Sequence, residues 1–145
     1  MLRRLINEKR MDNWPLNWHF YKRDQIIIIV LEDSIITIKN LQSYPFKPPQ
    51  VTYNGKDIKS YYAKLFNSNT SKSYNDDLIK LSGISCWCCE TILCKNKWRC
   101  QSRIKDIVDE FNNFRIYKKR ADERSWGRFI SRNLLVEDIP IYEFL

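Results

Sequence analysis

Two isoleucine-rich stretches restrict the fold of this chain more than any other feature of its sequence. The first, "QIIIIVLED", and the second, "SIITIKNL", meet at the polar turn residues Glu32 to Ser34. β-Branched residues are enriched in strands, and a short polar turn between two such runs is typical of an antiparallel hairpin. The aromatic stretch "LNWHFYKRD" directly precedes them, so the sequence predicts an antiparallel meander of three strands.

A fourth strand and several helices are expected around this meander. The prolines in "YPFKPPQVTY" exclude a central strand before Gln50, but Gln50 to Tyr53 can form one that ends at the turn Asn54-Gly55. Apolar residues recur at helical spacing in Leu2–Met11, Ile58–Phe66, Leu78–Leu81 (ended by Gly83), Ser102–Phe114 (capped by Ser102) and Asp122–Asn133. The predicted fold class is α+β: a four-stranded antiparallel meander flanked by an N-terminal helix and C-terminal helices.

The composition indicates a basic protein, with 25 Lys and Arg residues against 17 Asp and Glu residues and a formal net charge of +8. The basic residues are spread from Arg3 to Arg132, which is typical of solvated helix faces rather than of a nucleic-acid site. The start of the chain lacks an apolar leader, and the longest apolar run, Ile26 to Leu31, is too short to cross a bilayer. We expect a soluble intracellular protein, cytoplasmic or nuclear, that contacts neither membrane nor nucleic acid.

All five cysteines lie in the stretch "SCWCCETILCKNKWRC", from Ser85 to Cys100. Structural zinc usually takes its ligands from two separated Cys-x-x-Cys-like pairs, and the first three cysteines are too crowded for one such pair. An odd number of clustered cysteines also favours reduced thiols over a disulfide framework. We therefore expect no bound metal, although Cys94 and Cys100 with two of the earlier cysteines would supply four thiolates.

Two motifs of the sequence match the pattern of one enzyme family. "YPFKPP" runs from Tyr44 to Pro49, and "CETIL" runs from Cys89 to Leu93, followed by Trp98 and a predicted helix. Together with the strand order, these motifs resemble the proline loop and the active-cysteine segment of the ubiquitin-conjugating enzymes. The resemblance covers most of the chain and implies that family's fold.

The resemblance also has consequences for domain organisation. It implies a single ubiquitin-conjugating-enzyme-like domain over residues 1–145. The gap between Pro49 and Cys89 is longer than in the family, so an insertion is expected around residues 56–81.

By the same resemblance, Cys89 accepts ubiquitin or a ubiquitin-like protein as a thioester from an activating enzyme and passes it to a substrate lysine, usually with a ligase. No metal or organic cofactor is implied. The family's first helix helps to contact the activating enzyme and its proline loop helps to contact ligases, so Phe46 is an expected ligase contact. Cys86 and Cys88 compete with Cys89 as acceptors, because they lie in the same segment.

The sequence departs from the family at one catalytic motif. The family's His-Pro-Asn, whose asparagine helps to stabilise the oxyanion, is missing, and the only histidine, His19, lies in a predicted strand. Arg99-Cys100 also stands where the family usually has Ser-Pro after its tryptophan. The side chains that are candidates for the missing oxyanion donor are Asn54, Asn67, Asn69 and Asn75.

Other functions are compatible with the same residues. A catalytically inactive member of the same fold would bind ubiquitin or a conjugating enzyme as an adaptor. A small zinc-stabilised interaction domain would use the cysteines as ligands. A weaker alternative is nucleic-acid binding through the basic C-terminal helix.

Overall fold

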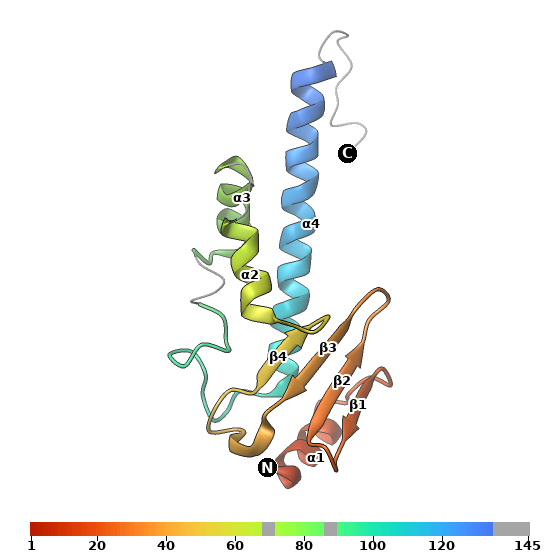
Figure 1. Cartoon of the computed structure of the whole chain (residues 1–145). Helices are drawn as coiled ribbons and strands as arrows, with labels where there is room; N and C mark the ends of the chain where they lie inside the picture. The colour runs from red at the N-terminus through yellow and green to blue at the C-terminus, as the bar shows by residue number, and fades with distance from the viewer. Residues whose placement is uncertain (68–71, 86–89, 135–145) are drawn as a thin grey trace.

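The structure is a computed structural model that describes residues 1–67, 72–85 and 90–134. Figure 1 shows a twisted sheet with helices against one face and one long helix that extends well beyond it. This arrangement confirms the predicted α+β class. In chain order the elements are α1 (Leu2–Met11), β1 (Trp18–Tyr21), β2 (Ile26–Val30), β3 (Ile35–Lys39), a 3-10 turn (Leu41–Ser43), β4 (Gln50–Tyr53), β5 (Lys56–Asp57), α2 (Ile58–Asn67), α3 (Lys72–Ser82) and α4 (Ile104–Leu134).

Within the described residues the sheet has five antiparallel strands in the order β1-β2-β3-β4-β5, so the prediction of four strands was wrong. The four predicted strands are all present, and the additional strand, β5, pairs Lys56 with Tyr53. It forms because Asn54 and Gly55 both adopt positive φ angles, 49° and 81°, which suit a two-residue hairpin turn. The turn that was expected to end the fourth strand instead folds the chain back along it.

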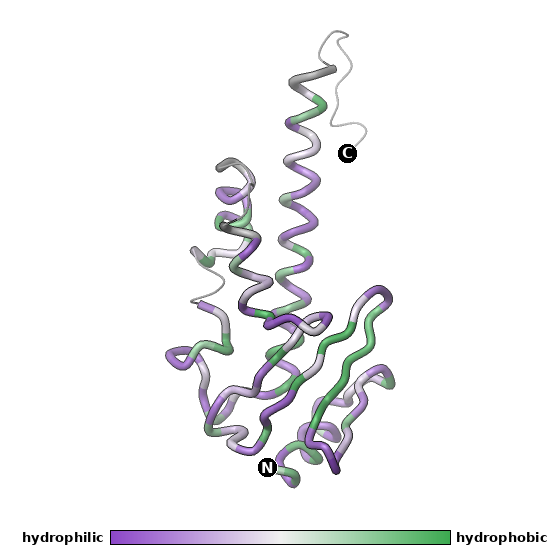
Figure 2. Tube along the Cα trace, viewed as in Figure 1, coloured by the Kyte–Doolittle hydropathy of each residue, from purple (hydrophilic) through white to green (hydrophobic). Residues whose placement is uncertain are grey.

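The apolar core lies between the sheet and the first half of α4. Successive strand residues point to opposite faces, and the buried residues on β2 and β3 are Ile27, Ile29, Ile36 and Ile38. The buried residues that α4 contributes at helical spacing are Ile104, Ile107, Val108, Phe111 and Phe114. Figure 2 shows the apolar stretches of β2 and β3 running side by side. The isoleucine-rich runs therefore form the centre of the sheet, as their composition predicts.

The C-terminal part of the described chain forms one helix rather than the two that were predicted. α4 is continuous over 31 residues, from Ile104 to Leu134. No Gly or Pro lies between Phe114 and Asp122, so no residue in that segment ends the helix. Asp122, the predicted start of a second helix, instead pairs with Lys118 one turn earlier, with 3.3 Å between the charged atoms.

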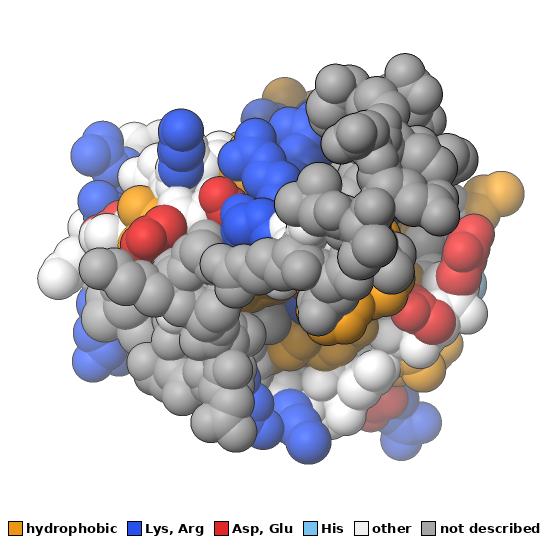
Figure 3. Space-filling model, turned by 90° about the horizontal axis from the view of Figure 1, so that it is seen from above, with side chains coloured by type: hydrophobic (Ala, Val, Ile, Leu, Met, Phe, Trp, Pro, Cys, Tyr) orange, Lys and Arg blue, Asp and Glu red, His pale blue; other side chains and the backbone are white. Residues whose placement is uncertain are grey.

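The segment expected as an insertion contains β5, α2 and most of α3. α3 is longer than the predicted helix Leu78–Leu81, but it ends at Gly83 as expected, with a φ of 71°. It packs on the outer half of α4, where Asp77 lies 2.8 Å from Arg128 and 3.7 Å from Arg124. Figure 3, seen from above, shows Lys and Arg side chains gathered beside Asp and Glu side chains on this end of the molecule.

Candidate functional site

The proline loop and the segment after the cysteines lie against each other, although they are far apart in sequence. The Trp98 indole Nε1 donates a hydrogen bond of 2.7 Å to the backbone carbonyl of Pro45. The Trp98 ring also packs on the buried ring of Tyr44, with 5.9 Å between centroids. Phe46, at the tip of the same loop, is 78% exposed. Trp98 therefore holds the proline loop in place, while the apolar side chain of Phe46 remains accessible to solvent.

A buried glutamate on α1 connects three separate parts of this region. The carboxylate of Glu8, which is 3% exposed, accepts hydrogen bonds from Arg4 Nε at 2.6 Å, Tyr44 Oη at 2.5 Å and the backbone N–H of Ile104 at 3.1 Å. Burial raises the pKa of Tyr44, and the bond to Glu8 raises it further, so the phenol stays protonated and donates. Glu8 thus holds α1, the proline loop and the start of α4 together.

The hydrogen bond from the Ile104 N–H to Glu8 shows that the predicted cap of α4 was wrong. Ser102 was expected to cap α4, but its Oγ accepts a hydrogen bond from the backbone N–H of Arg99 instead. Two backbone N–H groups at the start of α4 find carboxylate acceptors. Asp106 Oδ2 accepts a hydrogen bond from the N–H of Arg103, and Glu8 accepts one from the N–H of Ile104. A carboxylate from another helix therefore replaces the local cap. The N-terminus of a helix is a favourable place for this negative charge.

The residues directly after the cysteine cluster are fixed on α4 by a second glutamate. Glu110 accepts a hydrogen bond of 2.5 Å from the Thr91 hydroxyl through one carboxylate oxygen and one of 2.8 Å from the Ile92 N–H through the other. Thr91 and Leu93 are buried. Burial raises the pKa of Glu110, and the bonds from Thr91 and Ile92 partly oppose that rise. The "TIL" part of "CETIL" therefore has a defined place on the helix.

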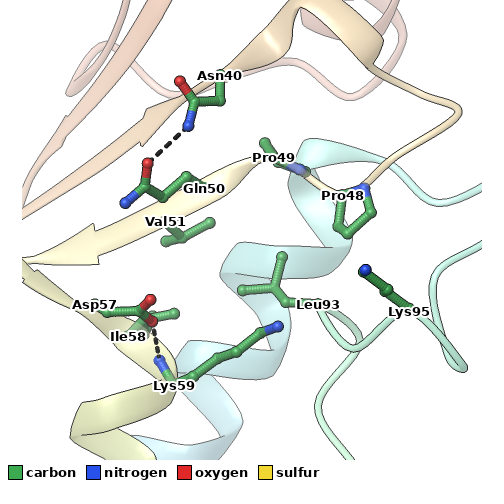
Figure 4. Close-up of a pocket in the computed structure, with 10 residues that line it drawn as sticks. All are labelled: Asn40, Pro48, Pro49, Gln50, Val51, Asp57, Ile58, Lys59, Leu93 and Lys95. Atoms are coloured by element: carbon green, nitrogen blue, oxygen red, sulfur yellow. Dashed lines mark hydrogen bonds between the residues drawn. The ribbon is translucent and has the colours of Figure 1, made fainter.

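Two hollows lie where the proline loop faces this segment. The first, of about 250 Å³, is drawn in Figure 4 and is lined by Asn40, Pro48, Pro49, Gln50, Val51, Asp57, Ile58, Lys59, Leu93 and Lys95. In that view the ammonium ends of Lys59 and Lys95 point into the hollow from opposite sides. The second, of about 340 Å³, is lined by Phe46, Lys47, Pro48, Lys95 and Trp98. Lys95 lines both, so positive charge lies between the two hollows.

The predicted acceptor, Cys89, lies outside the described residues, as do its competitors Cys86 and Cys88. Of the remaining cysteines, Cys94 is half-buried and Cys100 is exposed. The described part of the chain holds no group of three or more His, Cys, Asp or Glu side chains arranged to bind a metal ion. The competition among the first three cysteines therefore stays a prediction from sequence.

The candidate oxyanion donors whose side chains the structure describes, Asn54 and Asn75, lie in separate segments of the chain. The side-chain oxygen of Asn54 accepts a hydrogen bond of 2.9 Å from the Ile35 N–H, at the end of β4 away from the proline loop. Asn75 lies on α3, Asn67 ends α2, and Asn69 is outside the described residues. His19 lies exposed on β1. Asn54 closes the end of the β3–β4 pair, the structural role that turn asparagines commonly have.

Sequence reasoning missed three side chains that shape this region: Glu8, Glu110 and Lys59. An amphipathic pattern assigns charged residues to the solvent face, and both glutamates border apolar positions of their helices. Glu8 lies one turn after buried Leu5, and Glu110 lies next to buried Phe111. The sequence does show that each glutamate borders the apolar face of its helix. It does not show which residues bind the carboxylate, because these lie in distant segments.

Comparison with known proteins identified no relative: no family model, no curated protein and no solved structure matches this chain. Among the described residues, no helix is both long enough and apolar enough to cross a membrane.

Trp98→Phe is expected to lower the free energy of unfolding by about 1–2 kcal/mol, because the Pro45 carbonyl loses its donor while most apolar contact is kept. Urea unfolding followed by circular dichroism measures the change. Trp126→Phe is the matched control, since that ring is 57% exposed and stacks on Phe129. Equal losses in the two variants would show that the bond to the proline loop contributes no stability.

Glu110→Ala is expected to lower the free energy of unfolding by about 2–3 kcal/mol, because the buried Thr91 hydroxyl and the Ile92 N–H lose their acceptor. Glu110→Gln keeps the shape and one acceptor oxygen, so its loss should be smaller. The pair of variants is compared by urea unfolding. A loss for alanine no greater than for glutamine would mean that the two hydrogen bonds are replaced by water.

The raised pKa of Glu110 gives this comparison a pH dependence. Because the pKa of Glu110 in the folded protein is raised above its ordinary value of 4.5, the folded protein holds this proton more tightly than the unfolded chain does. Stability from this group is therefore present at low pH and is lost as pH rises through the raised pKa. We expect wild type to lose stability relative to Glu110→Gln over that window. If wild type instead gains stability relative to Glu110→Gln as pH rises, the hydrogen bonds to the carboxylate lower its pKa by more than burial raises it.

Proposed function

We propose that this protein accepts ubiquitin, or a ubiquitin-like protein, on Cys89 as a thioester and passes it to a substrate lysine, as a ubiquitin-conjugating enzyme does. The observation that carries the proposal is the hydrogen bond between Trp98 and Pro45. It joins the two motifs that resemble adjoining parts of that family's site. Support also comes from Glu110, which fixes the residues directly after Glu90 on α4.

The proposed reaction is two successive acyl transfers. In the first, the Cys89 sulfur bonds to the carbonyl carbon of the modifier's terminal thioester, and the bond from that carbon to the activating enzyme's sulfur breaks. The thiolate released from the activating enzyme takes up the proton that Cys89 lost. In the second, the lysine amine attacks the same carbon, the Cys89 sulfur leaves as a thiolate, and that thiolate takes up the proton that the amine gives up. Each transfer passes through a tetrahedral oxyanion that needs positive charge or hydrogen-bond donors nearby.

We infer that Lys59 and Lys95 supply part of that charge in place of the missing His-Pro-Asn. Both ammonium groups point into the hollow beside the proline loop, as Figure 4 shows. None of the ion pairs formed by described residues includes either lysine. The carboxylate of Asp57 lines the same hollow, so the two lysines leave it with a formal net charge of +1. Positive charge favours a cysteine in its thiolate form and stabilises a nearby oxyanion.

The missing His-Pro-Asn favours one other candidate function, an inactive adaptor of the same fold. Such a protein would bind ubiquitin or a conjugating enzyme without forming a covalent bond. The anchoring side chains Glu8, Glu110 and Trp98 would serve that role equally well, because they stabilise the site without taking part in chemistry.

A charging assay with activating enzyme, ubiquitin and ATP separates these functions. We expect a covalent adduct of this chain with ubiquitin that requires ATP and disappears on addition of a reducing agent, as a thioester does. Lys59→Ala/Lys95→Ala should form it more slowly, whereas Lys80→Ala/Lys119→Ala, which changes two exposed lysines on α3 and α4 outside the hollow, should not. Failure to form any adduct, together with non-covalent binding of ubiquitin, would replace the enzyme by the adaptor.

A further inference from the structure

The outer face of the sheet carries a row of apolar side chains along β2 and the start of β3, which no helix in the described part of the chain covers. Figure 1 looks onto this face, with α1 and the lower part of α4 behind the strands. Strand alternation places β2 residues Ile26, Ile28 and Val30 there, opposite the buried isoleucines. Val30 pairs with Ile35 on β3, and these two side chains are 43% and 47% exposed. A row of β-branched side chains thus faces solvent along the centre of the sheet.

The two ends of this apolar row carry opposite charge. The β1–β2 turn at one end holds Lys22 and Arg23 with one acid, Asp24, and all three are exposed. The β2–β3 turn at the other end holds Glu32 and Asp33, also exposed. The strand β2 joins the two turns directly, so the positive end and the negative end lie at opposite ends of one strand.

We propose that the outer sheet face binds a second copy of this chain in an isologous dimer. A two-fold axis between the two sheets, perpendicular to the strands, reverses the strand direction in the partner. The basic β1–β2 turn of each copy then meets the acidic β2–β3 turn of the other, while the isoleucine rows pack between them. The charge pattern favours this occupant because it is complementary to itself under that rotation. The proposal is independent of the proposed conjugating activity.

The apolar centre of the interface is tested by Ile28→Asp. Ile28 lies in the middle of the row and pairs with Thr37 on β3 and His19 on β1, so a charge there would be buried in the dimer and solvated in the monomer. Sedimentation equilibrium of wild type at up to about 100 μM should show a dimer, and the variant should weaken association about 100-fold. Circular dichroism checks that the variant folds. A wild-type protein that stays monomeric over this range overturns the proposal.

The electrostatic contact between the turns of the two copies is tested by mixing two charge-reversed variants. Lys22→Glu/Arg23→Glu makes both ends acidic, and Glu32→Lys/Asp33→Lys makes both ends basic, so each variant alone should dimerise more weakly than wild type. Mixed in equal amounts, they should restore association, because every turn then meets its opposite charge. A mixture that associates no better than its components would overturn the proposed arrangement.

A matched control for charge reversal lies on α4. Lys119→Glu/Arg120→Glu changes the same net charge as Lys22→Glu/Arg23→Glu on exposed residues away from the sheet. It should leave dimerisation unchanged. Asp33 also lies 3.8 Å from Arg115 in its own chain, but an exposed pair at that distance contributes little, so Glu32→Lys/Asp33→Lys should still fold. Equal weakening by the α4 control would assign the effect to net charge and contradict the proposed interface.

Discussion

Cys89→Ala is expected to abolish the ubiquitin adduct in the charging assay, and Cys89→Ser to convert it into one that survives reducing agent. A serine hydroxyl at the acceptor position forms an oxygen ester, which resists cleavage by added thiols, whereas a thioester is cleaved by acyl exchange with them and alanine offers no nucleophile. Non-reducing and reducing gels of the same reaction distinguish the two bonds. The serine variant therefore identifies the acceptor by the chemistry of the bond, and not only by loss of activity.

The remaining cysteines supply the controls for this experiment. Cys94→Ser and Cys100→Ser keep Cys89 and should charge like wild type with a bond sensitive to reducing agent. Cys86→Ser and Cys88→Ser test the competing positions in the same way. A stable ester in either of those variants would move the acceptor to that position and keep the proposed reaction. An adduct that persists in Cys89→Ala at the wild-type rate would remove Cys89 from the proposal.

Strand composition predicted the sheet well because its signal is local. The β-branched runs and the turn at Glu32 to Ser34 act over a few residues, and β1 to β4 appear where the sequence places them. Errors arose where a local signal has two outcomes. Asn54-Gly55 can end a strand or reverse it, and Asp122 can begin a helix or lie within one. In the second case helix-forming neighbours on both sides decided the outcome.

The candidate site was predicted only in part, because its motifs are local and its supports are not. "YPFKPP" and Trp98 are visible as motifs in the sequence, and the structure brings them into contact. Glu8 and Glu110 could not be found, because each is a single charged residue at the edge of an apolar helix face. Their partners, Tyr44 and Thr91, lie 36 and 19 residues away in sequence.

Glu8→Ala is expected to lower the free energy of unfolding by about 2–4 kcal/mol. The buried Tyr44 hydroxyl and the Ile104 N–H would both lose their acceptor, and each unsatisfied buried donor costs about 1–3 kcal/mol. Arg4 adds less, because its side chain is 34% exposed and water replaces the lost carboxylate. Urea unfolding followed by circular dichroism measures the total.

Two control variants separate the role of the Glu8 carboxylate from that of its position on α1. Glu8→Gln keeps one acceptor oxygen and the volume of the side chain, so it should lose about half as much stability as alanine. Glu123→Ala removes a glutamate from an exposed helical position and should change stability by less than about 0.5 kcal/mol. If Glu8→Ala behaves like Glu123→Ala, the carboxylate does not hold the three segments together. Full loss in Glu8→Gln as well would show that charge, and not only an acceptor, is needed at the start of α4, where the helix dipole favours a negative group.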